Sequence, residues 1–217
     1  MKITLIHPSR GRALKAKDTL AFWLAMSSKQ IEIEHILSID HSDDELQKEL
    51  YMMNFKDSLI VISDNTDVVQ ATNKAARMAT GDVLVYFSDD FKCEKDWDLD
   101  LYKALILHVL EPRLLKVDDC LQPFHVAILT IPIMTRELYK TLGYFWHQEY
   151  MSMFVDEDLY WTCKNNNWII FAEHLKFPHE HNCNGKAERD ETYIRSEANW
   201  NQGKAKFAER KALNFPL

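Results

Sequence analysis

Two adjacent carboxylates, Asp89 and Asp90, directly follow a continuous apolar run over residues 83–87. Such a run is typical of a central parallel strand that is buried on both faces. The carboxylates after it would face the crevice in which open α/β sheets bind ligands, and they repel each other unless a cation joins them. The pattern favours a hard divalent ion. The plain alternative is that Ser88, Asp89 and Asp90 form a turn.

Two histidines, His179 and His181, alternate on a short segment after Phe177 and Pro178. Alternate residues of an extended segment project to the same side, and imidazole nitrogens are common metal ligands. Either histidine could therefore complete the coordination shell of an ion held by an aspartate elsewhere. The alternative is an exposed loop in which the two histidines have no such role.

Three consecutive acids, Asp156, Glu157 and Asp158, lie at the expected start of a helix. Their negative charge complements the helix dipole, which is the plain explanation and the one that the residues alone favour. The alternative is that one of them is a general base, because a carboxylate beside a bound acceptor can accept a hydroxyl proton.

Charged residues also follow the first two expected strands. Arg10 and Arg12 come after the first, where a guanidinium can bind phosphate through two hydrogen bonds. Asp40 comes after the second, like the acidic residue that binds a ribose or base in many nucleotide-binding α/β folds. Their shared location at strand ends predicts a nucleotide site.

The apolar pattern predicts the elements that position these residues. Strands are expected over 2–6, 31–39, 58–62, 82–87, 124–131 and 168–172. Helices are expected over 10–26, 68–79, 97–110, 137–142 and 156–166, with a further helix starting near Asp43 and a helical tail over 188–213. The alternation of strand and helix in the first half predicts an α/β fold built on a mainly parallel sheet.

Composition excludes several classes of protein. The chain has 217 residues, a net charge of −7 and only 5 glycines, which stand alone, so a glycine-rich phosphate loop is absent. Any nucleotide phosphate must then be met by a metal ion or by basic side chains. The negative charge argues against a protein that coats nucleic acid. The four cysteines, Cys93, Cys120, Cys163 and Cys183, contain no C-x-x-C pair.

No apolar run approaches the roughly 20 residues that span a bilayer. Together with the widely spaced cysteines, which favour reduced thiols, this predicts a cytoplasmic protein without an integral membrane segment.

Taken in order, these motifs resemble the small GT-A-fold glycosyltransferases of the family 2 type over residues 3–193. Residues 6–12 are similar to that family's opening strand, which is followed by Pro-Thr/Ser and an arginine. Residues 71–75 and 79–82 are similar to its Ala-x-Asn and Ala-x-Gly-Asp motifs, and 156–161 to its acidic helix. The sequence departs from the pattern at Ser88, which stands at the first position of the D-x-D triplet.

The resemblance implies a GT-A fold in a single domain over 1–217, with a mainly parallel central sheet flanked by helices and a C-terminal helix. Residues 1–115 would bind the nucleotide sugar, 116–186 would supply the acceptor side and catalysis, and 187–217 would form the helical tail. The implied nucleotide-sugar contacts are Pro8, Ser9, Arg10, Arg12, Asp40, Asn73, Ser88 and Asp89.

The resemblance also implies the catalytic and metal-binding groups. Asp90, with His179 or His181, would hold Mn²⁺ or Mg²⁺. Asp156 aligns with the family's catalytic base. Because Val155 replaces the family's glutamate, Glu157 is an alternative candidate for the catalytic base.

We therefore expect transfer of a sugar, with inversion, from a nucleoside-diphosphate donor, in the first place a UDP-sugar, to an acceptor hydroxyl. A nucleotidyltransferase is one alternative, which pyrophosphate release would distinguish. A nucleotide-sugar-binding protein of the same fold without turnover is another. The acceptor is a glycan, another polymer or a modified DNA base, and the sequence does not decide among the three.

Overall fold

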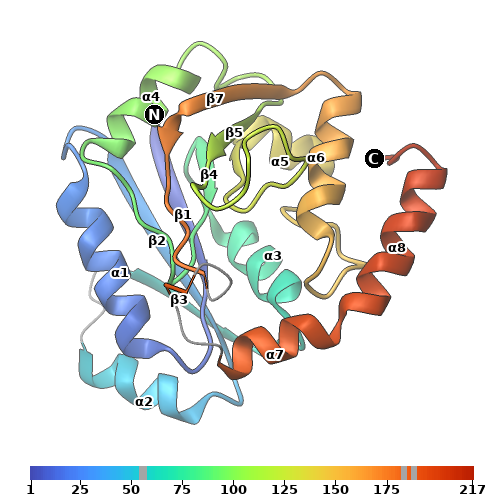
Figure 1. Cartoon of the computed structure of the whole chain (residues 1–217). Helices are drawn as coiled ribbons and strands as arrows, with labels where there is room; N and C mark the ends of the chain where they lie inside the picture. Colours follow the sequence, from blue (N-terminus) through green and yellow to red (C-terminus); the bar gives the residue numbers. More distant parts are fainter. Residues whose placement is uncertain (54–57, 182–184, 187–189) are drawn as a thin grey trace.

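The computed structural model describes residues 1–53, 58–181, 185–186 and 190–217, and its centre is a seven-stranded sheet (Figure 1). The strand order is β3-β2-β1-β4-β6-β5-β7. The strands are β1 (Lys2–Pro8), β2 (Glu32–Asp40), β3 (Ser58–Ser63), β4 (Val83–Tyr86), β5 (Leu114–Asp118), β6 (Ile133–Thr135) and β7 (Ile169–Lys176).

Strand direction places the ends of the first four strands together. The strands β3, β2, β1 and β4 are parallel, and Ile6 lies opposite both Ile36 and Tyr86. Strand β6 runs antiparallel to β4 and β5, while β5 and β7 are parallel. The sheet is therefore mainly parallel, as expected, and the carboxyl ends of β1 to β4 meet at one edge.

Helices cover both faces of the sheet. They are α1 (Ala13–Met26), α2 (Asp44–Met53), α3 (Val68–Met78), α4 (Trp97–Leu105), α5 (Arg136–Leu142), α6 (Val155–Asn165), α7 (Glu191–Ala198) and α8 (Trp200–Ala212). Trp23 of α1 and Leu101 of α4 are buried in one core with Leu5. Val69 of α3 and Leu138 of α5 are buried with Ile6, which points to the opposite face.

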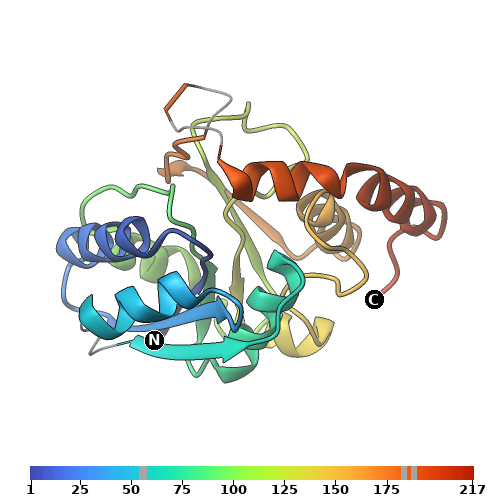
Figure 2. The ribbon, with the colours of Figure 1, turned by 90° about the horizontal axis from the view of Figure 1, so that it is seen from below.

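The two C-terminal helices follow one another along one side of the molecule, with α6 beside α8 (Figures 1 and 2). The buried guanidinium of Arg210 donates from Nε to Asp158 Oδ2 over 2.6 Å and ties α8 to α6. Gly203 permits this approach, because a Cβ there would lie 2.3 Å from the carbonyl oxygen of Met153. A side chain at this position would push α8 away from the segment that leads into α6.

The prediction of a strand over 124–131 is wrong, because these residues form a loop in the structure. Lys116 of β5 donates from Nζ to the carbonyl oxygens of Val126 and Ile128 over 2.8 and 2.7 Å. The loop carbonyls are thus satisfied by a buried lysine instead of by a neighbouring strand. Strands β5 and β6, on either side of this loop, were not predicted.

The helical ends also differ from the prediction. Helix α4 ends at Leu105, and Leu107 and Leu110 beyond it are exposed. The expected tail is two helices that meet at Asn199. Its first residues, 187–189, and Cys183 lie outside the described residues. Among the helices that the structure describes, none is both long enough and apolar enough to cross a membrane.

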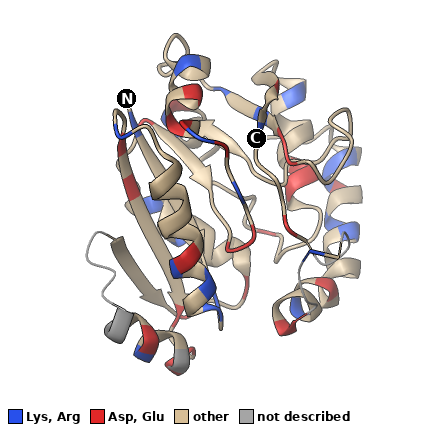
Figure 3. Ribbon diagram, turned by 60° about the vertical axis from the view of Figure 1, so that its left-hand side comes forward, with Lys and Arg blue, Asp and Glu red and all other residues tan. Residues whose placement is uncertain are grey.

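Acidic and basic residues are interspersed over the ribbon in the view of Figure 3. Neither this distribution nor the net charge of −7 produces a general positive field around the molecule.

Candidate functional site

A cavity of about 310 Å³, here called the central cavity, opens beyond the carboxyl ends of β1 and β4. It collects residues from both halves of the chain. Among those that line it are Ser9, Asp89, Asp90, Asp156, His179 and His181. The acidic doublet, the histidine pair and one acid of α6 thus meet in one space, although they lie far apart in the sequence.

In this cavity His179 lies beside Asp90, and His181 lies beside His179. An isolated antiparallel bridge between Phe91 and His179 brings the late segment beside the end of β4. As a result, His179 Nε2 lies 3.4 Å from Asp90 Oδ2, which also accepts a 3.0 Å hydrogen bond from the hydroxyl of Tyr193. The rings of His179 and His181 lie edge to face with centroids 4.9 Å apart.

The environment keeps Asp90 ionised. Burial opposes its negative charge, but the hydrogen bond and charge of His179, with the hydroxyl of Tyr193, outweigh burial and hold the pKa of Asp90 far below its usual range. Its other oxygen, Oδ1, is buried and accepts no hydrogen bond from the described residues. A buried carboxylate oxygen of this kind is one that a ligand can use.

This donor set fits a divalent cation. A buried carboxylate oxygen beside imidazole nitrogens suits Mn²⁺ and, through oxygen, Mg²⁺. Within the described residues, no three His, Cys, Asp or Glu side chains converge as a ready-made cage. An ion here would therefore take further ligands from water or from a bound phosphate, as Mg²⁺ sites commonly do.

Asp89 is held differently, by donors of the protein itself. Its side chain is buried and lies 2.7 Å from His7 Nε2 through Oδ1. The hydroxyl of Ser9 lies 3.3 and 3.1 Å from its two oxygens, and Thr19 donates to its backbone carbonyl over 2.7 Å. These contacts fix the carboxylate at the border of the central cavity.

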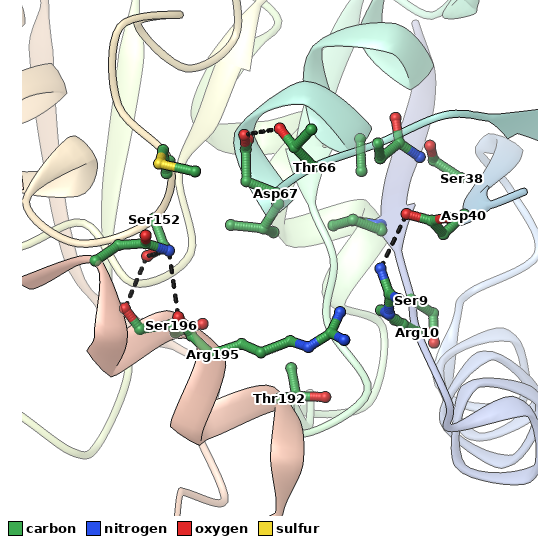
Figure 4. A pocket seen from close by; sticks show the side chains of 16 residues that line it. Ser9, Arg10, Ser38, Asp40, Thr66, Asp67, Ser152, Thr192, Arg195 and Ser196 are labelled. Atoms are coloured by element: carbon green, nitrogen blue, oxygen red, sulfur yellow. Dashed lines mark hydrogen bonds and ion pairs between the residues drawn. The ribbon is translucent and has the colours of Figure 1, made fainter. Parts of the chain in front are cut away.

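A second pocket of about 120 Å³, here called the side pocket, adjoins the central cavity (Figure 4). Pro8, Ser9 and Arg10 line both spaces. Asp40 lines the side pocket, where Oδ2 accepts a 2.9 Å hydrogen bond from Arg10 Nη1. The two spaces therefore lie side by side along the carboxyl edge of the sheet.

Hydrogen bonds also stabilise the charge of Asp40. The backbone N–H and the hydroxyl of Ser42 donate to Oδ1 over 2.8 and 2.7 Å. Burial raises the pKa of Asp40, but the contacts with Ser42 and the charge of Arg10 outweigh it, so the pKa lies below its usual range. Asp40 is therefore an ionised acceptor in the wall of the side pocket.

Helix α7 supplies the opposite wall, which the sequence did not predict. Thr192, Arg195 and Ser196 line the side pocket, and Figure 4 shows the Arg195 side chain reaching across it toward Arg10. The sequence marks only the start of this helix, through the capping residue Asp190. In the structure its carboxylate accepts a 3.0 Å hydrogen bond from the N–H of Thr192. No sequence motif singles out Arg195.

Arg12 lines the central cavity but is already paired. Its Nε and Nη2 groups both donate to the carboxylate of Asp190 over 2.7 Å, and its guanidinium carbon lies 5.1 Å from the ring centre of Tyr193. This fork joins the start of α1, just after β1, to the start of α7. Arg12 thus carries a positive charge at the cavity while it holds the wall of the site.

Asp156 lies in the first turn of α6 and faces the central cavity. Burial raises its pKa, although backbone N–H groups and the charge of Lys116 act in the opposite direction. Glu157 does not line the cavity, and its pKa is raised by burial and by the charge of Asp156. Asp158 is turned into the core, where the hydroxyl of Tyr150 and Arg210 donate to it. One of the three acids therefore faces the site.

Asn73 does not line either space. Its Oδ1 accepts 2.9 Å hydrogen bonds from the N–H groups of Phe145 and Trp146, and its Nδ2 donates to the carbonyl of Trp146. The structure thus gives Asn73 a role in joining α3 to the segment before α6. Ser88, by contrast, lines the central cavity as expected.

Residues 8–108 match the family model described as Glycosyl transferase family 2. The fold resembles that of S. aureus TarS residues 1–349, with a TM-score of 0.64 and 17% identity over 82% of this chain and 59% of that one. It also resembles the mannosyltransferase PcManGT of Pyrobaculum calidifontis, in a complex with GDP-Man and Mn²⁺, with a TM-score of 0.69 and 15% identity. The chain has the GT-A fold, and its residues 8–108 are similar to glycosyltransferase family 2.

The expected fold class and the resemblance are thereby confirmed. The match to the mannosyltransferase covers 96% of this chain and 64% of that one, so the chain spans under two thirds of both proteins. A complex of TarS 1–349 with UDP-GlcNAc also matches, with a TM-score of 0.62 and 14% identity over 97% of this chain and 72% of that one. No curated protein matches the chain in sequence.

Proposed function

We propose that the protein is a glycosyltransferase that moves a sugar from a nucleoside diphosphate to an acceptor hydroxyl. The observation that carries the proposal is that two adjoining spaces share a wall. The side pocket, which Asp40 lines, adjoins a central cavity that Asp89, Asp90 and Asp156 line. Residues 1–115 then supply most of the donor site, α7 closes its side pocket, and 116–186 supply the late histidines, the base and the acceptor side.

The nucleoside would occupy the side pocket. An ionised Asp40 there accepts a hydrogen bond from a base that presents an N–H, as uracil and guanine both do. The related structures include TarS with UDP-GlcNAc and a mannosyltransferase with GDP-Man. Two of the related TarS structures hold UDP or UDP-GlcNAc, so a UDP-sugar is the donor that we propose. Asp89 then receives a ribose hydroxyl.

Asp90, with His179 or His181, would hold Mn²⁺ or Mg²⁺ beside the diphosphate. A divalent cation at this point supplies positive charge that stabilises the departing nucleoside diphosphate. The protein contributes an ionised Asp90 with a buried oxygen that accepts no hydrogen bond from the described residues. Arg12 adds a fixed positive charge at the same cavity.

Asp156 is the base that we propose. It would accept the proton of the acceptor hydroxyl as the acceptor oxygen bonds to the anomeric carbon. The bond between that carbon and the β-phosphate oxygen breaks at the same time, and the nucleoside diphosphate leaves with the bonding electrons. Attack from the side opposite the leaving group inverts the anomeric configuration. A raised pKa supports this role, because it makes the ionised carboxylate a stronger base.

The test is release of a nucleoside diphosphate from a panel of UDP-, GDP- and other nucleotide sugars, with water or added acceptors, in Mn²⁺, Mg²⁺ or EDTA. We expect release from at least one donor, in the first place a UDP-sugar, that stops with EDTA and returns with metal. Pyrophosphate release from a nucleoside triphosphate and a sugar phosphate would instead identify a nucleotidyltransferase. Metal-dependent nucleotide binding without sugar loss from any donor would identify a binding protein.

A further inference from the structure

Two buried histidines lie beneath the site and have no part in the chemistry above. His7 of β1 and His35 of β2 are 0% and 4% exposed, on the sheet face that α1 covers. Phe87 packs edge to face against both rings, with centroid distances of 4.5 and 6.0 Å. Apolar side chains normally fill such positions in a parallel sheet, because a buried imidazole loses its hydration.

The two rings belong to an unbroken chain of hydrogen bonds that ends at Asp89. Ser58 Oγ lies 2.7 Å from His35 Nδ1, and His35 Nε2 lies 3.0 Å from His7 Nδ1. His7 Nε2 then lies 2.7 Å from Asp89 Oδ1. The chain therefore crosses β3, β2 and β1 and reaches a carboxylate of the central cavity.

The positions of the protons follow from the partners. Burial and the nearby charge of His7 lower the pKa of His35 well below its usual range, so His35 is neutral and carries one ring proton. When the Ser58 hydroxyl donates to His35 Nδ1, the ring proton of His35 is on Nε2. His7 Nδ1 then accepts that proton, and His7 Nε2–H donates to Asp89.

We propose that His7 is a positioning residue, which holds the Asp89 carboxylate in the orientation that receives the donor, and that His35 and Ser58 hold His7. This inference rests on the proposed function, because it assigns Asp89 to donor binding. The second contact to Asp89 Oδ1, from the Ser9 hydroxyl, is longer at 3.3 Å, so His7 makes the shorter hydrogen bond to that oxygen.

The variants His7→Phe and His7→Gln separate the hydrogen bond from the volume of the ring. Phenylalanine fills the space but donates nothing, whereas the glutamine amide can place an N–H near the former Nε2. We expect His7→Phe to weaken donor binding and raise KM by about tenfold to a hundredfold with little change in kcat. His7→Gln should recover most of that loss.

Leu5→Ala is the matched control for general destabilisation. Leu5 is fully buried on the same strand and the same face, two residues before His7. It lies in the core with Trp23 and Phe87, and its side chain cannot donate to Asp89. We expect this variant to lower the melting temperature without a comparable rise in KM. An equal rise in KM for Leu5→Ala and His7→Phe would overturn the proposal.

Titration of wild type and His7→Phe with UDP and Mn²⁺, together with histidine ¹⁵N NMR spectra of the free wild-type protein, completes the test. The spectra should show a proton on His7 Nε2, and a proton on Nδ1 alone would overturn the proposal. If wild type and His7→Phe bind nucleotide equally well, the role of His7 is wrong and the proposed function stands. If wild type binds no nucleotide in any metal, both are wrong.

Discussion

The carboxylates from the first half of the chain are surrounded by hydrogen-bond donors, whereas Asp156, from the second half, receives no side-chain hydrogen bond from the described residues. Ser42 and Arg10 donate to Asp40, and the pKa of Asp40 lies below its usual range. The pKa of Asp156 is raised by burial. Groups that stay charged suit binding, and a group that gains stability by taking up a proton suits base catalysis.

The first half is also the more regular one. Its strands β1 to β4 are all parallel neighbours, and the family match covers residues 8–108. The second half adds an antiparallel strand, a loop over a buried lysine and a helix, α7, that folds back to the site. In the proposed function, the regular sheet edge provides most of the donor side, with α7 as its opposite wall, and the other irregular segments provide the acceptor side. The following variants test that division.

The largest expected effect is that of Asp156→Asn, which keeps the volume of the side chain but removes the base. We expect kcat to fall by about 10²- to 10⁴-fold, as for other general bases. Steady-state transfer with the best donor measures it. Glu157→Gln is the control on the same turn, because Glu157 does not line the central cavity. A larger loss for Glu157→Gln would assign the base to that residue.

Arg210→Met should have the next largest effect, which is a loss of stability. Loss of the guanidinium leaves Asp158 buried without its ion-pair partner, which costs about 3–5 kcal/mol of unfolding free energy. Urea denaturation followed by circular dichroism measures it. Lys211→Met, at the exposed neighbouring position, should change that free energy by less than about 0.5 kcal/mol. Equal effects would mean that the buried pair does not hold α8 on α6.

Asp90→Asn tests the metal. An amide cannot supply the same charge to a cation, so the affinity for Mn²⁺ in the presence of UDP should fall by at least about tenfold. Calorimetric titration of protein treated with EDTA gives the dissociation constants of Mn²⁺ for wild type and for Asp90→Asn. Asp64→Asn removes an equal charge at an exposed position away from both spaces and should leave the affinity unchanged. Unchanged Mn²⁺ affinity in Asp90→Asn would exclude Asp90 as a ligand.

The smallest effect is a displacement of the pH profile. The positive charge of Lys116 lowers the pKa of Asp156, so Lys116→Met should raise that pKa further. Because the base acts only when ionised, activity is lost as the pH falls through its pKa. The acid limb of kcat should therefore move to higher pH. Lys164→Met on α6 is the control, and a shift as large in that variant would contradict the assignment.

Much of the donor side could be predicted from the sequence. An apolar run that ends in Asp89 and Asp90 fixes where a central strand stops, and strand ends in parallel sheets collect at one edge. The resemblance implied that His179 or His181 would join Asp90, and the structure brings His179 beside it through a single bridge between Phe91 and His179. Local periodicity sufficed for the strand ends, and the order of the motifs for the histidines.

The remaining features depend on contacts that no local pattern contains. The loop over 124–131 is apolar enough for a strand, but Lys116 binds its carbonyls. The reach of Arg195 into the side pocket follows from the placement of α7, which Arg12 and Asp190 join to the start of α1. Three consecutive acids in α6 look alike in sequence, and only packing turns Asp156 to the cavity and Asp158 to the core.

The division between a binding half and a reacting half is tested most directly by the dissociation constant of the donor nucleotide for Asp40→Asn and Asp156→Asn. We predict that Asp40→Asn weakens UDP binding in Mn²⁺ by about tenfold or more, since a hydrogen bond to a charged group contributes about 1.5–3 kcal/mol. Asp156→Asn should leave the constant within about twofold of wild type. Loss of nucleotide binding in Asp156→Asn, with binding intact in Asp40→Asn, would contradict the account.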